Sequence, residues 1–295
     1  MTVDPRCKLS YYTYVLQGLI DTGRRIRFRP LDCPRSSGAA MIIDGTQVWV
    51  HTDDNAEDIP EGPVAWADVV ARVNVVPGAT GVLPLGPLFG LRIWPLPRGY
   101  ATVAALVRGG AHPRRALEYV RFQGITRVGI DQYVPGASDP RYVFGRSRNW
   151  IGPHGTVREP RMRFADAVRG LPLEADVSVT DERMDLHEYL ERTRRSAVVF
   201  SNPAAHGCLG WKLGEFLALG KAIITVPIHG DLPSPLRHGE HLHVVEDDVD
   251  AMREAILQIT QDHEYRGRLE AGARDWYEAN MSPRRVGERL LAAAA

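Results

Sequence analysis

Apolar residues between positions 197 and 226 follow two different periods. Ala197 to Phe200 and Ala222 to Val226 are short runs rich in β-branched residues, which is typical of buried strands. Between the two runs, apolar residues recur at helical spacing, at Leu209, Leu213, Phe216, Leu217 and Leu219. Gly220 then stands where a helix C-cap glycine is expected. A strand, a loop, a helix and a second strand in this order predict a parallel α/β unit.

The remaining apolar pattern predicts further elements along the chain. Helices are expected over residues 8–21, 161–171, 186–194, 248–259, 264–279 and 283–291, and strands over 142–144, 177–179 and 242–245. Residues 40–51 predict a hairpin, because Asp44-Gly45 is a strong turn signal between two β-rich runs. Residues 102–122 predict one or two helices with a break near Gly109.

The length of the chain indicates two domains. With 295 residues it is long enough for two domains of about 150 residues each. A stretch that contains Pro135, Gly136, Ser138 and Pro140 has the composition of an interdomain linker. Hydrophobic residues make up 44% and charged residues 24% of the chain, as in ordinary soluble globular proteins.

Charge and cysteine usage narrow the class of partner. The formal net charge is zero, which does not favour bulk attraction to nucleic acid or to a membrane. Residues 24–29 are rich in arginine, so a local basic groove that binds nucleic acid stays an alternative. Cys7, Cys33 and Cys208 are scattered, which indicates free thiols in a reducing compartment. No run of 18 apolar residues and no signal-peptide pattern is present, so we expect a cytoplasmic protein without a membrane span.

The loop from Ser201 to Gly210 has the properties of an anion site. In open α/β sheets, ligands lie outside the carboxyl ends of the strands, where this loop is expected. Its last residues begin a helix, whose first amides are unpaired and carry the positive end of the dipole. Gly207 and Gly210 would let a phosphate approach the backbone. Lys212 adds a positive charge, and Glu215 is an acceptor suited to sugar hydroxyls.

Two runs of sequence here resemble a known family. GEFLALGKAIIT at residues 214–225 and HGDLPSPLRHGEHLHVV at 229–245 resemble the donor-binding half of GT-B glycosyltransferases, closest to the exostosin-like and bacterial group 1 branch. The resemblance covers roughly residues 140–290 and implies an α/β fold with two Rossmann-like domains facing across a cleft. The implied parts are an abbreviated acceptor-binding domain over 1–138, a nucleotide-sugar donor domain over 139–280, and a helix over 281–295 that returns to the first domain.

The resemblance also implies donor contacts. The family's helix carries a glutamate that binds the donor ribose, and Glu215 occupies that position. A Gly-Arg pair at the end of the domain's first strand supplies a cation for the diphosphate, and Arg146 matches it. The family's partner lysine has no clear match, which leaves Arg148 and Lys212 as alternatives.

One departure from the family bears on the mechanism. Many retaining members have a second glutamate eight residues before the first, whereas this chain has Gly207, so we expect inversion. An inverting transferase needs a base to accept the acceptor's proton, and the candidates in the first domain are Asp53, Asp54 and Asp131, with His51 in the same loop as the first two. The cations and the helix amides would stabilise the leaving diphosphate without a metal ion, and we expect no cofactor beyond the nucleoside diphosphate sugar.

Each assignment has a structural alternative. Lys212 and Glu215 also fit an exposed i, i+3 pair on a helix, and the two arginines after the first strand fit solvated turn residues. The aspartates at 53 and 54 fit a turn or a helix cap. His206 is placed to reach the donor sugar, although a lone loop histidine is more often exposed to solvent. Histidines at 238, 241 and 243 suggest a metal site, but no carboxylate or cysteine set completes one.

The function predicted from these residues is glycosyl transfer from a nucleoside diphosphate sugar. Two alternatives keep the fold: a nucleotide-sugar epimerase of the non-hydrolysing type, and a non-catalytic scaffold that binds a partner. Product analysis without an acceptor separates the enzymes, because only an epimerase alters the donor alone. The acceptor and the oligomeric state have no signal in the sequence.

Overall fold

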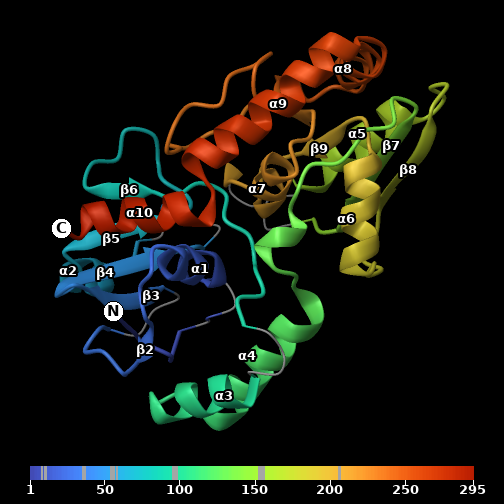
Figure 1. Cartoon of the computed structure of the whole chain (residues 1–295). Helices are drawn as coiled ribbons and strands as arrows, with labels where there is room; N and C mark the ends of the chain where they lie inside the picture. Colours follow the sequence, from blue (N-terminus) through green and yellow to red (C-terminus); the bar gives the residue numbers. More distant parts are fainter. Residues whose placement is uncertain are drawn as a thin grey trace. The chain divides into compact units, whose positions relative to one another are not determined.

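The chain has an α/β fold in two compact units (Figure 1). The computed structural model describes residues 1–7, 9, 12–34, 38–53, 57, 59–94, 99–151, 157–204 and 207–295. Unit 1 comprises Met1–Gln132, Asp231–Pro233 and Asn280–Ala295, and unit 2 comprises Tyr133–Gly230 and Ser234–Ala279. The predicted α/β class is therefore confirmed, and the first division between the units lies after residue 132 where the sequence indicated residue 138.

Unit 1 contains a mixed six-stranded sheet. Its strands are β1 (Thr2–Val3), β2 (Arg27–Phe28), β3 (Ala39–Ile43), β4 (Thr46–His51), β5 (Val69–Arg72) and β6 (Val82–Pro84), in the order β2-β1-β3-β4-β5-β6. Strands β4, β5 and β6 are parallel, whereas β3 is antiparallel to both of its neighbours. The predicted hairpin is confirmed at β3–β4, where Asp44 and Gly45 have φ of 51° and 101°. Two positive φ angles are what a type I′ turn requires.

Helices of unit 1 agree with the pattern where the apolar period is long. They are α1 (Thr13–Asp21), α2 (Glu61–Trp66), α3 (Gly99–Arg108), α4 (Pro113–Thr126) and α10 (Pro283–Ala293), with a 3₁₀ turn at Ile130–Gln132. The predicted break near Gly109 is confirmed between α3 and α4. The sequence did not predict α2, β1 or β6, because these short elements lie outside any β-branched run or turn signal that was recognised.

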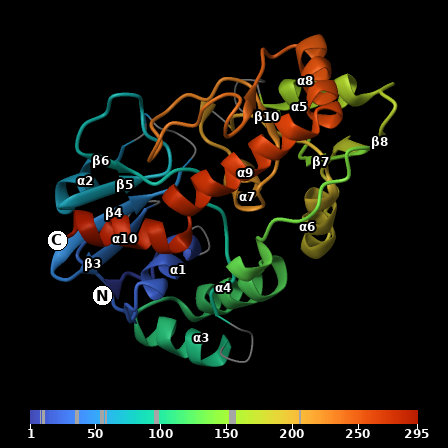
Figure 2. The same cartoon turned by 45° about the horizontal axis from the view of Figure 1, so that its top comes forward.

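Helices α1 and α10 pack closely although they lie at opposite ends of the chain (Figures 1 and 2). Glycines allow the close approach, since a Cβ at Gly18 would lie 2.1 Å from the carbonyl oxygen of Pro283, and one at Gly287 would lie 2.4 Å from that of Gly18. The Tyr14 hydroxyl donates to the carbonyl oxygen of Met281 at 2.6 Å. The end of the chain is therefore part of unit 1.

Unit 2 contains parallel strands in the order of a doubly wound fold. They are β7 (Tyr142–Ser147), β8 (Glu174–Val179), β9 (Val199–Ser201), β10 (Ile223–Thr225) and β11 (His243–Val244). The sheets are β7-β8 and β11-β10-β9, and they adjoin where the Ala197 amide donates to the Tyr142 carbonyl at 2.8 Å. The order β8-β7-β9-β10-β11 is 2-1-3-4-5 in chain order, so the chain changes direction across the sheet between β7 and β9.

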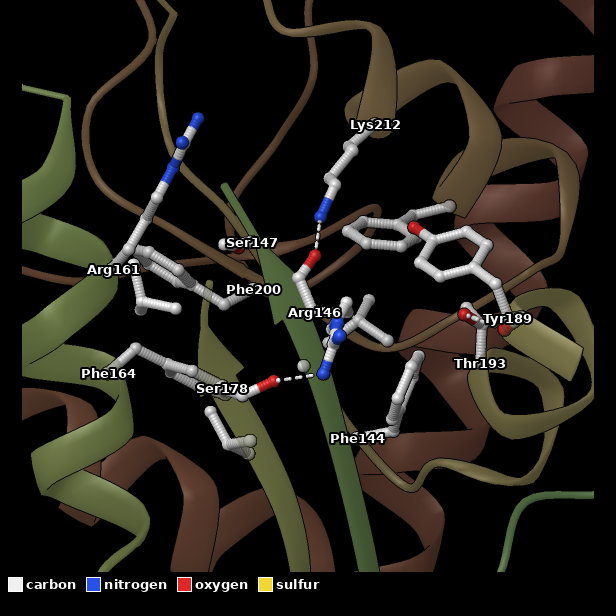
Figure 3. Close-up of a pocket in the computed structure, with 15 residues that line it drawn as sticks. Phe144, Arg146, Ser147, Arg161, Phe164, Ser178, Tyr189, Thr193, Phe200 and Lys212 are labelled. Atoms are coloured by element: carbon white, nitrogen blue, oxygen red, sulfur yellow. Dashed lines mark hydrogen bonds between the residues drawn. The ribbon is translucent and has the colours of Figure 1, made fainter. Parts of the chain in front are cut away.

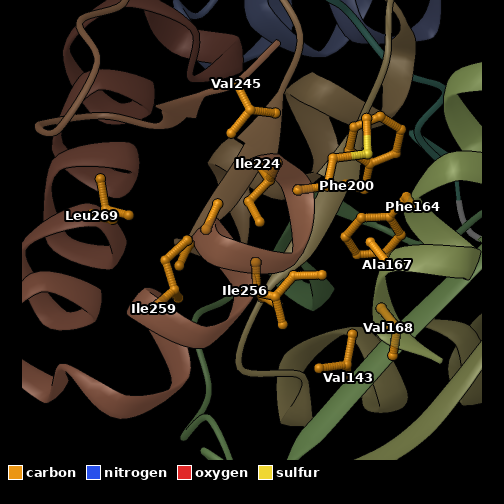
Figure 4. Packing of buried hydrophobic residues seen from close by; sticks show 14 of the residues in the cluster. Val143, Phe164, Ala167, Val168, Phe200, Ile224, Val245, Ile256, Ile259 and Leu269 are labelled. Atoms are coloured by element: carbon orange, nitrogen blue, oxygen red, sulfur yellow. The ribbon is translucent and has the colours of Figure 1, made fainter. Parts of the chain in front are cut away.

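Helices α5 (Arg158–Val168), α6 (Leu186–Arg195), α7 (Trp211–Ala218), α8 (Val249–Gln261) and α9 (His263–Asn280) surround these strands. One apolar core joins the strands to α5, α8 and α9, and its members include Val143, Phe164, Ile224, Ile256 and Leu269 (Figure 4). Burial of such side chains contributes about 1.5–3 kcal/mol each, which fixes the strand ends that carry the site. The predicted C-cap is confirmed at Gly220, whose φ is +58°.

Candidate functional site

The carboxyl ends of β7 and β9 form the point where the strand order of unit 2 reverses. Ligands of doubly wound sheets bind at this point, because the connections leave it in opposite directions and open a crevice. Arg146 and Ser147 end β7, and Ser201 ends β9. The chain after β9 leads to α7, which places Lys212 in the first turn of that helix.

Three cationic side chains from different elements gather at this point. Arg146 of β7, Arg161 of α5 and Lys212 of α7 line one pocket, together with Phe144, Phe164, Ser178, Tyr189 and Phe200 (Figure 3). The cavity among them has a volume of about 20 Å³, close to the space that one water molecule needs. The predicted pair Arg146 and Lys212 therefore lies together, and Arg161 joins it.

The Lys212 ammonium is held inside this pocket. It donates to the backbone carbonyl of Arg146 and lies 5.7 Å from the centre of the Tyr189 ring. Burial lowers the pKa of Lys212 to about 8; the Glu215 carboxylate opposes this shift, and the Arg161 charge adds to it. The ammonium is therefore only weakly favoured over the neutral amine near neutral pH, and a nearby anion would stabilise the charged form.

The two arginines are anchored by neutral groups more than by acids. Arg146 donates to Ser178 Oγ at 3.1 Å and to the Glu182 carbonyl at 3.1 Å, and the exposed Glu182 carboxylate lies at 3.5 Å. Its Nε is buried without a partner among the described residues. Arg161 donates to Asn202 Oδ1 at 3.0 Å and to the Arg148 carbonyl at 2.9 Å, and burial lowers its pKa. The site therefore keeps capacity to bind an anion.

The sequence did not identify Arg161 as a site residue. Helical periodicity placed it at the start of a helix but gave no indication of which face meets the end of β7. Arg148 was predicted as an alternative donor ligand. Its side chain is exposed and does not line the pocket, and it contributes its carbonyl oxygen to Arg161 instead.

The turn before α7 has the open backbone that the sequence indicated. Gly207 has a φ of +72°, and nothing lies within 4 Å of the position that a Cβ would occupy. Together with Asn202, Cys208 and Gly210 it lines a cavity of about 10 Å³. Gly210 is the N-cap of α7 and supplies no side-chain cap. The predicted sugar contact His206 lies outside the described residues.

Glu215 lies inside unit 2. The residue is 5% exposed, and a carboxylate oxygen accepts a hydrogen bond from the Tyr133 hydroxyl at 3.3 Å. Burial, together with the nearby Glu215 charge, raises the pKa of Tyr189. The carboxylate thus contacts polar groups of the protein, and its predicted contact with a ribose remains a prediction.

In unit 1, the predicted base Asp53 is a half-exposed residue that contacts a buried polar pair, His51 and Arg72. The β4–β5 register pairs His51 with Arg72, and an Arg72 Nη contacts His51 Nδ1 at 3.2 Å. His51 Nε2 lies 3.1 Å from Asp53 Oδ2, and Asn74 Nδ2 donates to the Asp53 carbonyl at 2.9 Å. Arginine only donates, so Nδ1 must accept and Nε2–H must donate to Asp53.

The other two predicted bases are Asp54 and Asp131. Asp54 lies outside the described residues. Asp131 is exposed in the 3₁₀ turn, and its Oδ2 accepts from the side chain of Gln132 at 3.0 Å. Among the predicted acids that the structure describes, Asp53 is the better candidate for a base. His51 holds one of its carboxylate oxygens in place, and its side chain is 49% exposed and so accessible.

One acidic pattern and one histidine-rich pattern, both of which could suggest a metal site, have structural roles instead. Asp248 and Asp250 form an Asp-x-Asp triplet, and the Asp248 carboxylate caps α8 by accepting from the amides of Asp250 and Ala251. His238, His241 and His243 each use Nδ1 in an internal hydrogen bond. Within the described ranges, no three His, Cys, Asp or Glu residues are placed to hold a metal ion.

Comparison with known proteins links unit 2 to sugar transfer. Residues 150–262, less than half of the chain, match the family model described as "Glycosyl transferases group 1", and this match supports a glycosyl transfer function. No match was found among curated protein sequences. In the described part of the chain, no helix has the length and apolar character needed to cross a membrane.

Several solved structures are similar in fold. A glycosyltransferase from Rickettsia africae has 13% identity and a TM-score of 0.45, with 82% of this chain and 69% of that chain covered. Anabaena HepE, solved with UDP and glucose, has 10% identity and a TM-score of 0.43 over 82% and 70%. Sucrose-phosphate synthase from Thermosynechococcus elongatus has 23% identity and a TM-score of 0.32 over 40% of this chain, which spans only 31% of that synthase. All three TM-scores lie below 0.5, so these similarities carry no information about activity.

Proposed function

We propose that the chain is a GT-B glycosyltransferase and that unit 2 binds the diphosphate of a nucleoside diphosphate sugar. The observation that carries this proposal is that Arg146, Arg161 and Lys212 all line one pocket at the switch point between β7 and β9. Diphosphate is the ligand that best matches two guanidinium groups and an ammonium, since arginine binds phosphate oxygens in pairs and lysine adds a point charge. The group 1 match over residues 150–262 supports the same class of donor.

The diphosphate would lie at the mouth of the pocket. The enclosed volume of about 20 Å³ is too small for a phosphate, whereas the side chain of Arg146 is 21% exposed and reaches the surface. The open backbone at Gly207 and the N-terminus of α7 offer amides at the same end of the sheet. These groups would stabilise the charge that develops on the leaving diphosphate, so no metal ion is required in this mechanism.

Asp53 is the proposed base for inversion in unit 1. Both nitrogens of His51 are engaged, one by Arg72 and the other by Asp53, so the histidine has no free lone pair for a proton. The second Asp53 oxygen remains available in a half-exposed side chain. A carboxylate that accepts the proton of an acceptor hydroxyl as this attacks the anomeric carbon is the group that inverting transfer needs. The first unit would bind the acceptor, and the three free cysteines suit a cytoplasmic enzyme.

The donor site is tested by calorimetric titration with a panel of nucleoside diphosphates. Arg161→Met should weaken binding about 10-fold or more, because it removes a charged hydrogen-bond donor worth about 1.5–3 kcal/mol. Arg163→Met is the matched control, since Arg163 lies on the same helix but pairs with Asp247 at 2.5 Å and does not line the pocket. Absence of binding to the wild-type chain, or equal losses in both variants, would contradict the proposed site.

The base is tested separately by Asp53→Asn. Once an acceptor supports turnover, this change should lower kcat by about 10²–10⁴-fold, the usual contribution of general base catalysis. The affinity for nucleoside diphosphate should stay within about 2-fold, because the diphosphate ligands belong to unit 2. A variant with wild-type kcat would remove Asp53 from the mechanism.

A further inference from the structure

Unit 1 contains a second pocket that the proposed donor site does not use. It lies between helices α3 and α4 and the segment that follows β1, and we call it the α3–α4 pocket. Its lining includes Cys7, Leu9, Leu106, Ala111, Tyr119 and Phe122. The cavity volume is about 410 Å³, within the range of small-molecule sites and far larger than the gaps that packing leaves in protein interiors.

The pocket contains two neutral polar groups, the Tyr119 hydroxyl and the Cys7 thiol, and the Tyr119 hydroxyl is unpaired within the described residues. Tyr119 is 9% exposed, and its hydroxyl has no hydrogen-bond partner among the described residues. Burial, with a smaller contribution from Cys7, raises the pKa of Tyr119, so the phenol stays protonated. Burial also raises the pKa of Cys7 to about 12, and its thiol donates to the Asp4 carbonyl at 3.2 Å. A buried hydroxyl without a partner is costly, and a ligand can relieve that cost.

Charge at this pocket is confined to exposed side chains. Arg115 and Glu118, both exposed residues of α4, are the charged residues in its lining, and Glu118 pairs with Arg114 at 2.9 Å. Most of the remaining lining is apolar or aromatic. The chemistry therefore matches a neutral ligand with a largely apolar body.

We infer that the α3–α4 pocket binds an uncharged small molecule with an aromatic or aliphatic body and one polar group that hydrogen-bonds to the Tyr119 hydroxyl. The ligand body would pack against Leu9, Leu106 and Phe122. Trp94 lies edge-on to Tyr119, with ring centroids 6.2 Å apart, and this contact helps to hold the phenol ring in place. The inference does not depend on the transferase proposal, because every lining residue belongs to unit 1 and none is a proposed catalytic or donor residue.

The test is a calorimetric titration of the whole chain with 2-naphthol, without nucleotide. The naphthalene ring fits the apolar lining, and its hydroxyl can bond to Tyr119. Tyr119→Phe should weaken binding about 3- to 10-fold, the effect of one neutral hydrogen bond. Tyr100→Phe is the matched control: it removes a hydroxyl from α3, where Tyr100 is 90% exposed, and should leave the affinity unchanged.

A second pair of variants tests the cavity itself. Ala111→Leu adds volume inside the pocket and should abolish binding, whereas Ala101→Leu makes the same change at an exposed position of α3 and should not. If Ala111→Leu fails to fold, the Tyr119→Phe result decides. No binding of 2-naphthol up to its solubility limit, or binding that neither Tyr119→Phe nor Ala111→Leu weakens, would overturn the inference.

Discussion

Two lysines of unit 2, one buried and one partly buried, have the same lowered pKa but different surroundings. Burial lowers the pKa of both Lys212 and Lys221 to about 8. Lys221 is fully buried and donates to Ser138 Oγ at 2.6 Å and to the Arg194 carbonyl at 2.7 Å, with Glu270 at 4.0 Å. Lys212 has one hydrogen bond within the described residues, to the Arg146 carbonyl. Each lysine has one acidic and one cationic neighbour: Glu215 and Arg161 for Lys212, Glu270 and Arg266 for Lys221.

The difference shows which lysine is structural and which is available for a ligand. The partners of Lys221 come from the linker, the end of α6 and α9, so its ammonium joins three segments. Lys212 has fewer hydrogen bonds within the described residues, and it lies at the switch point of the sheet. A low pKa therefore marks burial in both cases, and only the partners distinguish a structural role from a binding role.

The largest expected effect is on stability at Lys221. Lys221→Met should lower the free energy of unfolding by about 2–4 kcal/mol, because the Ser138 hydroxyl and the Arg194 carbonyl lose the ammonium that donates to them, and Glu270 loses a nearby positive charge. The affinity for nucleoside diphosphate should remain within about 2-fold of wild type at temperatures where the variant is folded. Urea unfolding and calorimetric titration measure the two quantities. A stable variant that has lost nucleotide binding would reverse the assignment.

The counterpart is Lys212→Met. It should weaken nucleoside diphosphate binding by about 2 kcal/mol, or roughly 30-fold, because it removes a charge-assisted hydrogen bond to the phosphate. Stability near neutral pH should change by only about 1 kcal/mol or less, since the variant removes the repulsion from Arg161 but also the attraction to Glu215. The same two measurements apply. Loss of stability equal to that of Lys221→Met would show that both lysines are structural.

The next effect is on the pH dependence of stability. Between about pH 8 and pH 10.5 both lysines bind fewer protons in the folded chain than in the unfolded chain. Below this window both ammonium groups are charged in the folded chain and the full cost of burying them is present. As the pH rises through the window they lose their protons and this cost disappears, so the free energy of unfolding should rise by up to about 1.4 kcal/mol per pH unit for each lysine. Lys212→Met should remove about half of that slope in urea unfolding at pH 8 and above. An unchanged slope would show that Lys212 does not titrate there.

The smallest expected effect concerns the coupling between the cations. Arg161→Met should raise the pKa of Lys212 by a few tenths of a unit and leave that of Lys221 unchanged, because Arg161 opposes the charge on Lys212. The chain has only three lysines, Lys8, Lys212 and Lys221, so carbon-13 labelling of lysine would give three NMR signals to follow. Equal shifts at Lys212 and Lys221 would show a general change in unit 2.

Much of unit 2 and part of its site could be predicted from the sequence, because strand ends are set by local patterns. The runs at 197–200 and 222–226 predicted β9 and β10, the strand-end rule and the helix start pointed to Lys212, and the family resemblance pointed to Arg146. Arg161 could not be found in this way, since it depends on how α5 packs on the sheet. The burial of Glu215 was also missed, because its tyrosine neighbour at 133 is distant in sequence and only tertiary packing brings it there.

In unit 1 the local signals were strong and the site signals were weak. The Asp44-Gly45 turn predicted the hairpin because two positive φ angles favour these residues. The same sequence could not show that His51 pairs with Arg72, because that contact depends on the register between β4 and β5. Parallel register is set by packing across the sheet and leaves no pattern within either strand.

The most direct test of the account is the titration of Lys212 by lysine-specific NMR, with and without a nucleoside diphosphate. We predict that Lys212 titrates near pH 8 in the free protein, and that saturating nucleotide raises its pKa by about one unit or more while Lys221 is unaffected. Nucleotide that binds but leaves the pKa of Lys212 unchanged, or shifts Lys221 instead, would contradict it.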